Sequence, residues 1–140
     1  MPVMTETERE KFLAESRVGV LAVARDGRPP LALPIWYDYE PGGELLLWTD
    51  QGTVKERVIR AAGELSLSVQ QETRPYKYVT VSGPVVSASA KPTDAEAFRI
   101  AARYLPDDEA RAFVDGSLKE SSVLIRVRPE KWLSTDHSKA

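Results

Sequence analysis

The sequence predicts a mainly β (α+β) fold, a small antiparallel barrel of about six strands with peripheral helices. The predicted elements run helix, three strands, helix, two strands, two helices and a last strand. Consecutive strands are joined by tight turns, whereas a doubly wound parallel sheet needs a long crossover after each strand. The 140 residues are the usual length of one domain, so we expect a single domain over 1–140.

The helices are predicted from capping residues followed by apolar positions at helical spacing. Thr5 and Thr93 each precede a glutamate by three residues, which is the spacing of a capping box. Gly63 and Pro106 follow apolar helical stripes and predict where two of the helices end. The first helix therefore starts near Thr5, and the others are expected over 53–62, 93–105 and 107–114.

The strands are predicted from alternating or β-branched segments between glycine-containing turns. Pro34 lies inside one of them and predicts an edge, a bulge or a ligand-lined position, because proline cannot donate to a strand ladder. Gly83-Pro84 predicts a bulge or bend inside another. The expected strands are 17–24, 30–39, 44–49, 65–71, 75–88 and 122–127.

Composition excludes several classes of function. The formal net charge is −2 and no basic block occurs, so no nucleic-acid partner is expected. The chain has no cysteine, which removes disulfides and thiolate metal sites and fits a reducing cytoplasm. No apolar run is long enough to span a membrane, and the N-terminal segment lacks the apolar stretch of a signal peptide. Metal-ligand spacing is also absent, so no metal site is expected.

The segment from Thr49 to Lys55 is the first candidate site. A strand ends, a turn with Gly52 follows, and a helix begins, where free N–H groups and a partial positive charge favour an anion. Thr53, Lys55 and Arg57 would add a hydroxyl and two positive charges to a phosphate site. The competing interpretation, which residue chemistry alone favours, is that Thr53 only caps the helix with Glu56 and that the basic side chains face solvent.

Two aromatic segments are further candidates. Pro34, Trp36 and Tyr37 on one strand could line the pocket of a flat heterocycle, although strand alternation could equally point one aromatic inward and the other outward. Lys77 and Tyr78 could bind an anionic substrate or cofactor tail, but a tyrosine-lined surface or dimer seam fits as well. For each segment taken alone, the structural interpretation is at least as good as the functional one.

No catalytic side chain is indicated. His137 is the only histidine and lies three residues from the chain end, where a disordered tail is expected. No Ser-His-Asp or Cys-His set can be assembled around it. Four acidic residues near turns are expected to have solvated roles: Asp26, Asp38, Asp50 and Glu72.

Taken together and in this order, the segments resemble the flavin/deazaflavin oxidoreductase superfamily, the split-barrel relatives of pyridoxamine 5'-phosphate oxidase. The chain looks closest to the actinobacterial branch that depends on coenzyme F-420. The resemblance covers nearly the whole chain and is carried by VGVLAVARDGRPPLALPIWYDY (18–39), LLLWTDQGTVKERVIR (45–60), RPYKYVTVSGPV (74–85) and the closing PEKWLSTDHSK. One departure is Ala-Gly-Glu at 62–64, where many relatives carry Asp-Pro-Arg.

This resemblance implies a split-barrel homodimer with the cofactor in a groove between subunits. It implies that the region of Thr53 and Lys55 meets the cofactor's phosphate. It also implies that the strands of Pro34–Tyr37 and Trp48–Thr49 flank the ribityl chain and ring.

The function expected from the resemblance is hydride transfer from reduced coenzyme F-420 to an unsaturated organic acceptor, a small-molecule substrate. Because the cofactor carries the chemistry in such enzymes, the absence of a catalytic dyad is explained. One alternative is an FMN-dependent enzyme of the pyridoxamine 5'-phosphate oxidase type. Another is a non-catalytic protein that binds a cofactor or tetrapyrrole, since a fold does not determine chemistry. The sequence does not indicate which acceptor is reduced.

Overall fold

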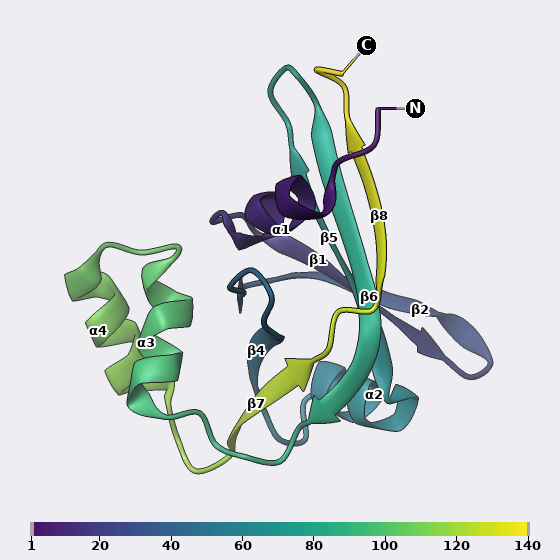
Figure 1. The fold of residues 1–140 in the computed structure, drawn as a ribbon. Helices are drawn as coiled ribbons and strands as arrows, with labels where there is room; N and C mark the ends of the chain where they lie inside the picture. Colours follow the sequence, from purple (N-terminus) through teal and green to yellow (C-terminus); the bar gives the residue numbers. More distant parts are fainter. Residues whose placement is uncertain (1, 140) are drawn as a thin grey trace.

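The computed structural model describes residues 2–139 as a curled, antiparallel eight-stranded sheet with four helices around it (Figure 1). The strand order is β2-β1-β5-β6-β7-β4-β3, and β8 pairs with β6 outside this path. The mainly β barrel with peripheral helices is therefore confirmed. The elements are α1 (Glu6–Ala14), β1 (Gly19–Arg25), β2 (Arg28–Ile35), β3 (Tyr37–Asp38), β4 (Leu45–Asp50), α2 (Val54–Ala62), β5 (Glu64–Gln71), β6 (Lys77–Ser87), α3 (Asp94–Ala102), α4 (Asp107–Ser117), β7 (Ser122–Val127) and β8 (Lys131–Asp136).

Three capping residues start or stop helices as predicted, whereas α3 ends at Ala102 instead of 105 and α4 runs on to Ser117 instead of ending at 114. Thr5 and Thr93 form complete capping boxes at the starts of α1 and α3. Gly63 ends α2 in the left-handed region at φ 73°, which glycine adopts without the steric penalty of a Cβ. Local sequence signals therefore set these helix ends.

Strand β6 organises the whole sheet. Its first half pairs with β5 on one side and with β8 on the other, and its last residues pair with β7. The change of partner occurs at Gly83, because Ser82 still pairs with Lys131 of β8 whereas Val85 already pairs with Val127 of β7. The predicted bend at Gly83-Pro84 is thus where β6 leaves β8 and joins β7. Figure 1 shows β6 running beside β8 and then curving toward β7.

The core lies inside the curl of the sheet and beneath α1 and α2. Its most completely buried side chains come from α1, α2 and most of the strands, and they include Leu13, Leu21, Tyr37, Leu47, Ile59 and Leu67. A separate small cluster holds α3 against α4 through Ala97, Ala101, Ala110 and Val114. The α3–α4 pair stands beside the sheet (Figure 1), and Ile100 of α3 also packs against Leu46 of β4 and Leu124 of β7.

Three sequence predictions about elements were wrong. The chain end is not a disordered tail, because β8 pairs along β6 and the amide of His137 donates to the carbonyl of Tyr76 at 3.0 Å. The sheet accordingly has eight strands instead of six. The single strand expected over 30–39 is broken at Trp36 into β2 and β3, which pair with different neighbours. Pro34 is confirmed on an edge strand, since β2 ends the strand order.

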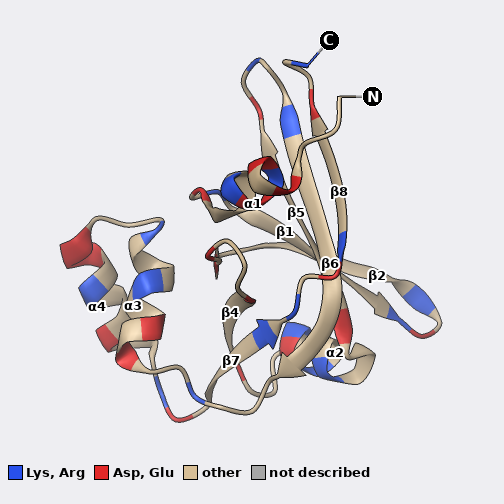
Figure 2. Ribbon diagram, in the orientation of Figure 1, with Lys and Arg blue, Asp and Glu red and all other residues tan. Residues whose placement is uncertain are grey.

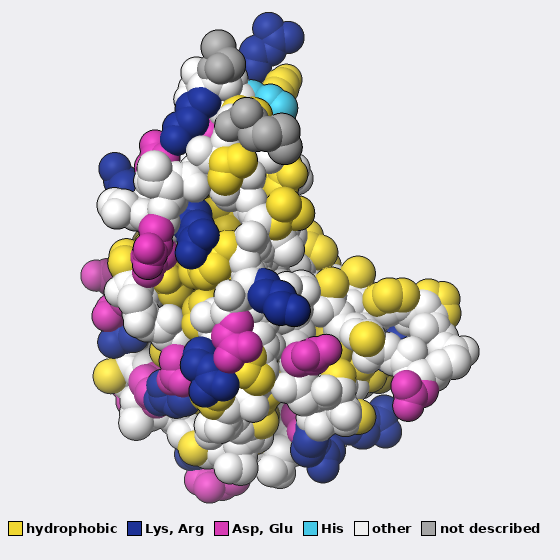
Figure 3. Space-filling model, turned by 45° about the vertical axis from the view of Figure 1, so that its right-hand side comes forward, with side chains coloured by type: hydrophobic (Ala, Val, Ile, Leu, Met, Phe, Trp, Pro, Cys, Tyr) yellow, Lys and Arg dark blue, Asp and Glu magenta, His cyan; other side chains and the backbone are white. Residues whose placement is uncertain are grey.

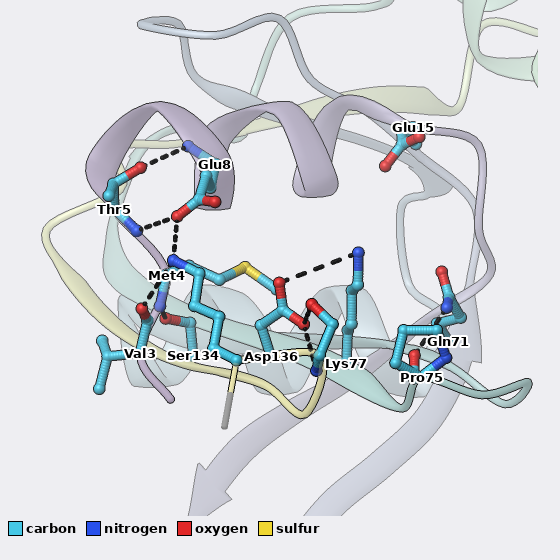
Figure 4. A network of polar contacts seen from close by, with 12 residues as sticks. Val3, Met4, Thr5, Glu8, Glu15, Gln71, Pro75, Lys77, Ser134 and Asp136 are labelled. Carbon is cyan, nitrogen blue, oxygen red and sulfur yellow. Dashed lines mark hydrogen bonds and ion pairs between the residues drawn. The ribbon is translucent and has the colours of Figure 1, made fainter. Parts of the chain in front are cut away.

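The N-terminal segment lies beside β8 and is held there by polar contacts (Figure 4). The amide of Met4 donates to Ser134 Oγ at 3.1 Å, and the amide of Asp136 donates to the carbonyl of Pro2 at 2.7 Å. Glu8 accepts a hydrogen bond from the amide of Thr5 and forms an ion pair with Lys139. These contacts join the first helix to the last strand and hold residues 131–139 against the rest of the chain.

Glu8 gives this junction a dependence on pH. Its hydrogen bonds with Lys139 and Thr5 lower the pKa of the carboxyl from 4.5 to about 2. A depressed pKa means that the ionised form stabilises the fold, fully above pH 4.5 and progressively less as the pH falls toward 2. We expect Glu8→Gln to lower the urea midpoint at pH 7, with the difference from the wild type shrinking between pH 4.5 and 2. Glu6→Gln on the same turn is the matched control, and an equal loss at every pH would contradict the assignment.

Charges of both signs are interspersed over α1, α3 and α4 (Figure 2). Within residues 2–139, no helix combines the length and apolar character that crossing a bilayer requires.

Candidate functional site

A cavity of about 540 Å³ lies between the sheet and the α3–α4 pair. Its walls come from the edge strand β2, from β4 and the start of α2, and from α3, α4 and the loop that follows α4. One end is apolar and aromatic, and the other carries hydroxyl groups and charges. The cavity therefore joins two chemically different halves.

Aromatic side chains form the apolar half. Trp36 stacks on Tyr104, with ring centroids 4.8 Å apart and an angle of 12° between the planes. The ring centroid of Phe113 in α4 lies 5.3 Å from that of Trp36 and 5.7 Å from that of Trp48. Pro34 and Ile100 complete this wall. Such a surface suits a flat apolar ring, because aromatic groups gain from stacked and edge-to-face contact.

The polar half lies where β4 gives way to α2. Thr53 Oγ1 donates to the carbonyl of Asp50 at 2.9 Å and lies 3.3 Å from Thr49 Oγ1. Lys55, the second residue of α2, is half-buried and lines the cavity. It has no carboxylate partner within 4.0 Å among residues 2–139. A positive charge, two hydroxyls and the start of a helix thus converge on one end of the cavity, an arrangement that favours an anion.

The capping interpretation of Thr53 is correct only in part. The Thr53 side chain accepts from the amide of Glu56 at 3.4 Å, so the residue does cap α2. Glu56, however, accepts from the amide of Gly52 at 2.9 Å and from Arg60, instead of closing a box with Thr53. The Glu56 carboxylate is therefore paired with Gly52 and Arg60, and it does not neutralise the charge of Lys55.

An ion pair between a half-exposed arginine and a buried carboxylate fixes the α3–α4 side of the cavity. Arg99 of α3 donates to Asp38 Oδ2 at 2.8 Å, and Arg103 Nη1 lies 3.7 Å from Asp38 Oδ1. Tyr104 holds the same junction, since its hydroxyl accepts from the amide of Tyr37 and donates to the carbonyl of Arg17 at 2.8 Å. The solvated role predicted for Asp38 was wrong, because only 7% of this residue is exposed and its charge is paired.

The structure brings together six of the ten predicted cofactor-binding residues. These six line the cavity: Pro34, Trp36, Trp48, Thr49, Thr53 and Lys55. Tyr37 is instead buried, as strand alternation allowed, and its hydroxyl donates to the carbonyl of Leu13 at 2.6 Å. This burial raises the pKa of Tyr37 above its ordinary value. Arg57 is exposed on another face of α2.

Lys77 and Tyr78 lie on β6 outside the cavity of their own chain. Lys77 is 3.9 Å from Asp136 in the junction between α1 and β8 (Figure 4). Tyr78 pairs with Gln70 of β5 and Thr135 of β8. Their role in cofactor binding therefore stays a prediction, and it requires a second copy of the chain.

Sequence reasoning missed several residues of the cavity. Phe113, Ser117 and Lys119 line it from α4 and the following loop. Asp50 also lines it, although a solvated turn position was predicted. Asp50 falls inside the predicted segment Thr49–Lys55, but its carboxylate was not expected to take part in the site. Nothing in the sequence of α4 showed that this helix would face β4.

Among residues 2–139, no group of three or more His, Asp or Glu side chains is placed to hold a metal ion.

Comparisons with known proteins agree on the family. The family model described as pyridoxamine 5'-phosphate oxidase matches residues 5–136. A solved F-420 reductase is 27% identical and superposes with a TM-score of 0.73, over 89% of this chain and 94% of the other. The conserved hypothetical protein Rv2991 of Mycobacterium tuberculosis is 25% identical with a TM-score of 0.80, over 98% of this chain and 88% of the other.

A more distant structure shares the fold alone. HutZ, the heme storage protein of Vibrio cholerae, is 16% identical with a TM-score of 0.67, over 93% of this chain and 94% of the other. The comparison with curated proteins finds no match. The match over residues 5–136 nevertheless covers almost the whole chain. The chain belongs to the pyridoxamine 5'-phosphate oxidase family of flavin- and deazaflavin-type split barrels.

Proposed function

We propose that this protein is an oxidoreductase that uses reduced coenzyme F-420 to transfer a hydride to an unsaturated organic acceptor. The observation that carries the proposal is the two-ended cavity, with an aromatic wall at one end and Lys55 and Thr53 at the other. The similarity to an F-420 reductase supports the deazaflavin over other cofactors of this fold. The absence of cysteine supports a cytoplasmic location.

The residues of the cavity fit such a cofactor. Pro34, Trp36 and Trp48 offer flat apolar surface to its ring, and the hydroxyls of Thr49 and Thr53 offer hydrogen bonds to its ribityl chain. Lys55 would hold the phosphate. When bound, the deazaflavin supplies the hydride, while the protein supplies orientation and exclusion of water.

A side-by-side titration tests the proposal. Trp36 and Trp48 line the cavity, whereas Trp132 lies elsewhere, 6.3 Å from the ring of Tyr39 and beneath Arg9. In a Trp132→Phe background, quenching of tryptophan fluorescence therefore reports on the cavity. We expect F-420 to bind more tightly than FMN, and turnover with enone or quinone acceptors only when reduced F-420 is present. Tighter binding of FMN would favour the FMN-dependent alternative, and binding without turnover the non-catalytic one.

We propose that the site is completed in a homodimer. Val18 at the rim of the cavity, one residue before β1, is 52% exposed, and Val20 on β1 is 46% exposed. Pro34 on the neighbouring strand is exposed as well. Figure 3 shows hydrophobic side chains along the projecting β1–β2 hairpin and the strands above it. A second copy covering this face would enclose the cavity and bring Lys77 and Tyr78 toward it.

We expect a dimer in solution at micromolar concentration. The apolar face around Val20 is larger than the single exposed apolar residues that a monomer tolerates. Sedimentation velocity gives the mass directly. Val20→Lys is expected to produce monomers by placing a charge in the interface. Val54→Lys changes a valine on α2 that is 53% exposed, and it should leave the dimer intact. A wild-type monomer would overturn the prediction.

The aromatic residues of the site are expected to contribute to affinity more than to stability. Trp36→Ala removes a half-buried ring that faces the cavity, and Tyr78→Ala removes one that the partner subunit would contribute. Each should weaken F-420 binding by about tenfold, which corresponds to roughly 1.4 kcal/mol. The free energy of unfolding should change less. Unchanged affinity in both variants would mean that these rings serve packing alone.

A further inference from the structure

We propose that Lys119 is a second anion-binding residue of the cavity and that Asp50 competes with an anionic ligand for its ammonium group. The proposal rests on the proposed function, because the anion is the phosphate of the bound cofactor. Nothing in the sequence pattern pointed to Lys119, which lies in the loop between α4 and β7. Both Lys119 and Asp50 line the polar half of the cavity together with Lys55.

The backbone of Lys119 is fixed at the rim of the cavity. Its amide donates to Ser122 Oγ at 3.1 Å, and its carbonyl accepts from the amide of Ser122 at 2.9 Å. Ser121, in the same loop, is held too, since its carbonyl accepts from the amide of Gln51 at 2.8 Å. The loop is therefore tied to the end of β4, and only the side chain of Lys119 is free to move.

Asp50 is oriented by the same serine. Ser122 is 1% exposed, and its hydroxyl donates to Asp50 Oδ1 at 3.1 Å. The other carboxylate oxygen, Oδ2, lies 3.8 Å from Lys119 Nζ. One buried hydroxyl thus positions both the backbone of the lysine and the carboxylate that it faces.

The contact between Lys119 and Asp50 is weak enough to exchange. The two groups lie beyond hydrogen-bond distance, and the side chain of Lys119 is 62% exposed, so solvent screens the pair. A bound phosphate, whether the monoester of FMN or the singly charged diester of F-420, can accept a direct, charge-assisted hydrogen bond from the ammonium group, which Asp50 at 3.8 Å does not. When phosphate occupies the polar half, the ammonium group turns from Asp50 to the ligand. Asp50 then acts against anion binding, by its own charge and by competing for Lys119.

Two substitutions separate these contributions. Lys119→Ala should weaken FMN and F-420 binding by about fivefold while leaving riboflavin unchanged, as expected for a partly exposed charge pair. Asp50→Asn keeps an oxygen for Ser122 but removes the charge, so it should tighten binding of the phosphorylated ligands by about twofold to fivefold. In the Asp50→Asn background, the loss caused by Lys119→Ala should be larger than in the wild type, because the lysine no longer has a competing partner.

The matched control is Lys91→Ala. Lys91 pairs with Glu120 at 3.1 Å and does not line the cavity, so its removal changes the net charge by the same amount without touching the site. Equal effects of Lys91→Ala and Lys119→Ala would overturn the proposal, as would identical effects of Lys119→Ala in both backgrounds. Lys55→Ala distinguishes a failure of the role proposed for Lys119 from a failure of the proposed function. If Lys55→Ala lowers the preference for phosphorylated ligands but Lys119→Ala does not, only the role of Lys119 fails. If neither FMN nor F-420 binds, the proposed function fails together with it.

Discussion

Gly83→Ala is expected to destabilise the protein by about 3 kcal/mol or more, roughly 10 °C in the unfolding midpoint for a domain of this size. A Cβ built on Gly83 would lie 1.7 Å from the carbonyl oxygen of Arg128 and 2.9 Å from its carbonyl carbon. These are backbone atoms of the segment that connects β7 to β8. They cannot rotate away as the end of a flexible side chain would.

The neighbouring hydrogen bonds keep that segment in place. The amide of Arg128 donates to the carbonyl of Pro84 at 3.0 Å, and the amide of Glu130 donates to the carbonyl of Ser82 at 2.9 Å. Making room for a methyl group at Gly83 therefore disrupts the point at which β6 exchanges β8 for β7. The loss should spread to both strand pairs, and hydrogen exchange of β7 and β8 would report it.

Gly116→Ala is the matched control, because it makes the same chemical change with the opposite expected sign. Gly116 lies within α4, and a Cβ there would meet no atom within 4 Å. Alanine in a helix is favoured over glycine by roughly 0.5–1 kcal/mol, so this variant should be slightly more stable than the wild type. Urea unfolding of the two variants measures the difference. If the Gly83→Ala protein is as stable as the wild type, the backbone of Arg128 can move away from Gly83 at little cost, and the prediction is wrong.

The sequence predicted most of the fold because its signals were local. Capping at Thr5 and Thr93, the stop at Gly63 and the bend at Gly83 each depend on a few adjacent residues. The last strand was missed because β8 is ordered by β6 and by the N-terminal segment, which are far away in the chain. Its alternation is also short: Leu133 is 61% exposed, whereas Ser134 is buried. In β8 an apolar residue is therefore exposed and a polar residue is buried, so its apolar pattern does not predict a strand with a buried face.

The candidate site was predicted on its β side and missed on its helical side. Trp48, Thr53 and Lys55 belong to one continuous segment, so a strand-turn-helix pattern brought them together. Phe113 and Lys119 enter the cavity because α3, and with it α4, is held against the sheet by Arg99 and Tyr104 and by the packing of Ile100. Contacts between residues so far apart in the chain, such as Arg99 with Asp38, produce no periodic pattern in the sequence. Asp38 was misjudged for the same reason, since its partner lies on α3.

Lys55→Ala is expected to weaken binding of F-420 and of FMN at least tenfold, while the apo protein keeps equal or slightly higher thermal stability. Lys55 is the second residue of α2, where the helix dipole disfavours a positive charge. Removing it should therefore not harm the empty protein. A hydrogen bond to a charged group contributes roughly 1.5–3 kcal/mol, which is about tenfold or more in affinity. The half-buried position of Lys55 in the cavity supports a value in this range.

Two comparisons make this prediction specific to the phosphate. Riboflavin lacks that group, so Lys55→Ala should change its affinity much less than that of FMN. Arg57→Ala removes an equal charge from the same helix but from its exposed face, and it measures the long-range electrostatic contribution. The ratio of FMN to riboflavin affinity should fall about tenfold with Lys55→Ala and much less with Arg57→Ala. If Lys55→Ala leaves that ratio at the wild-type value, Lys55 does not bind phosphate and Thr53 serves only to cap α2.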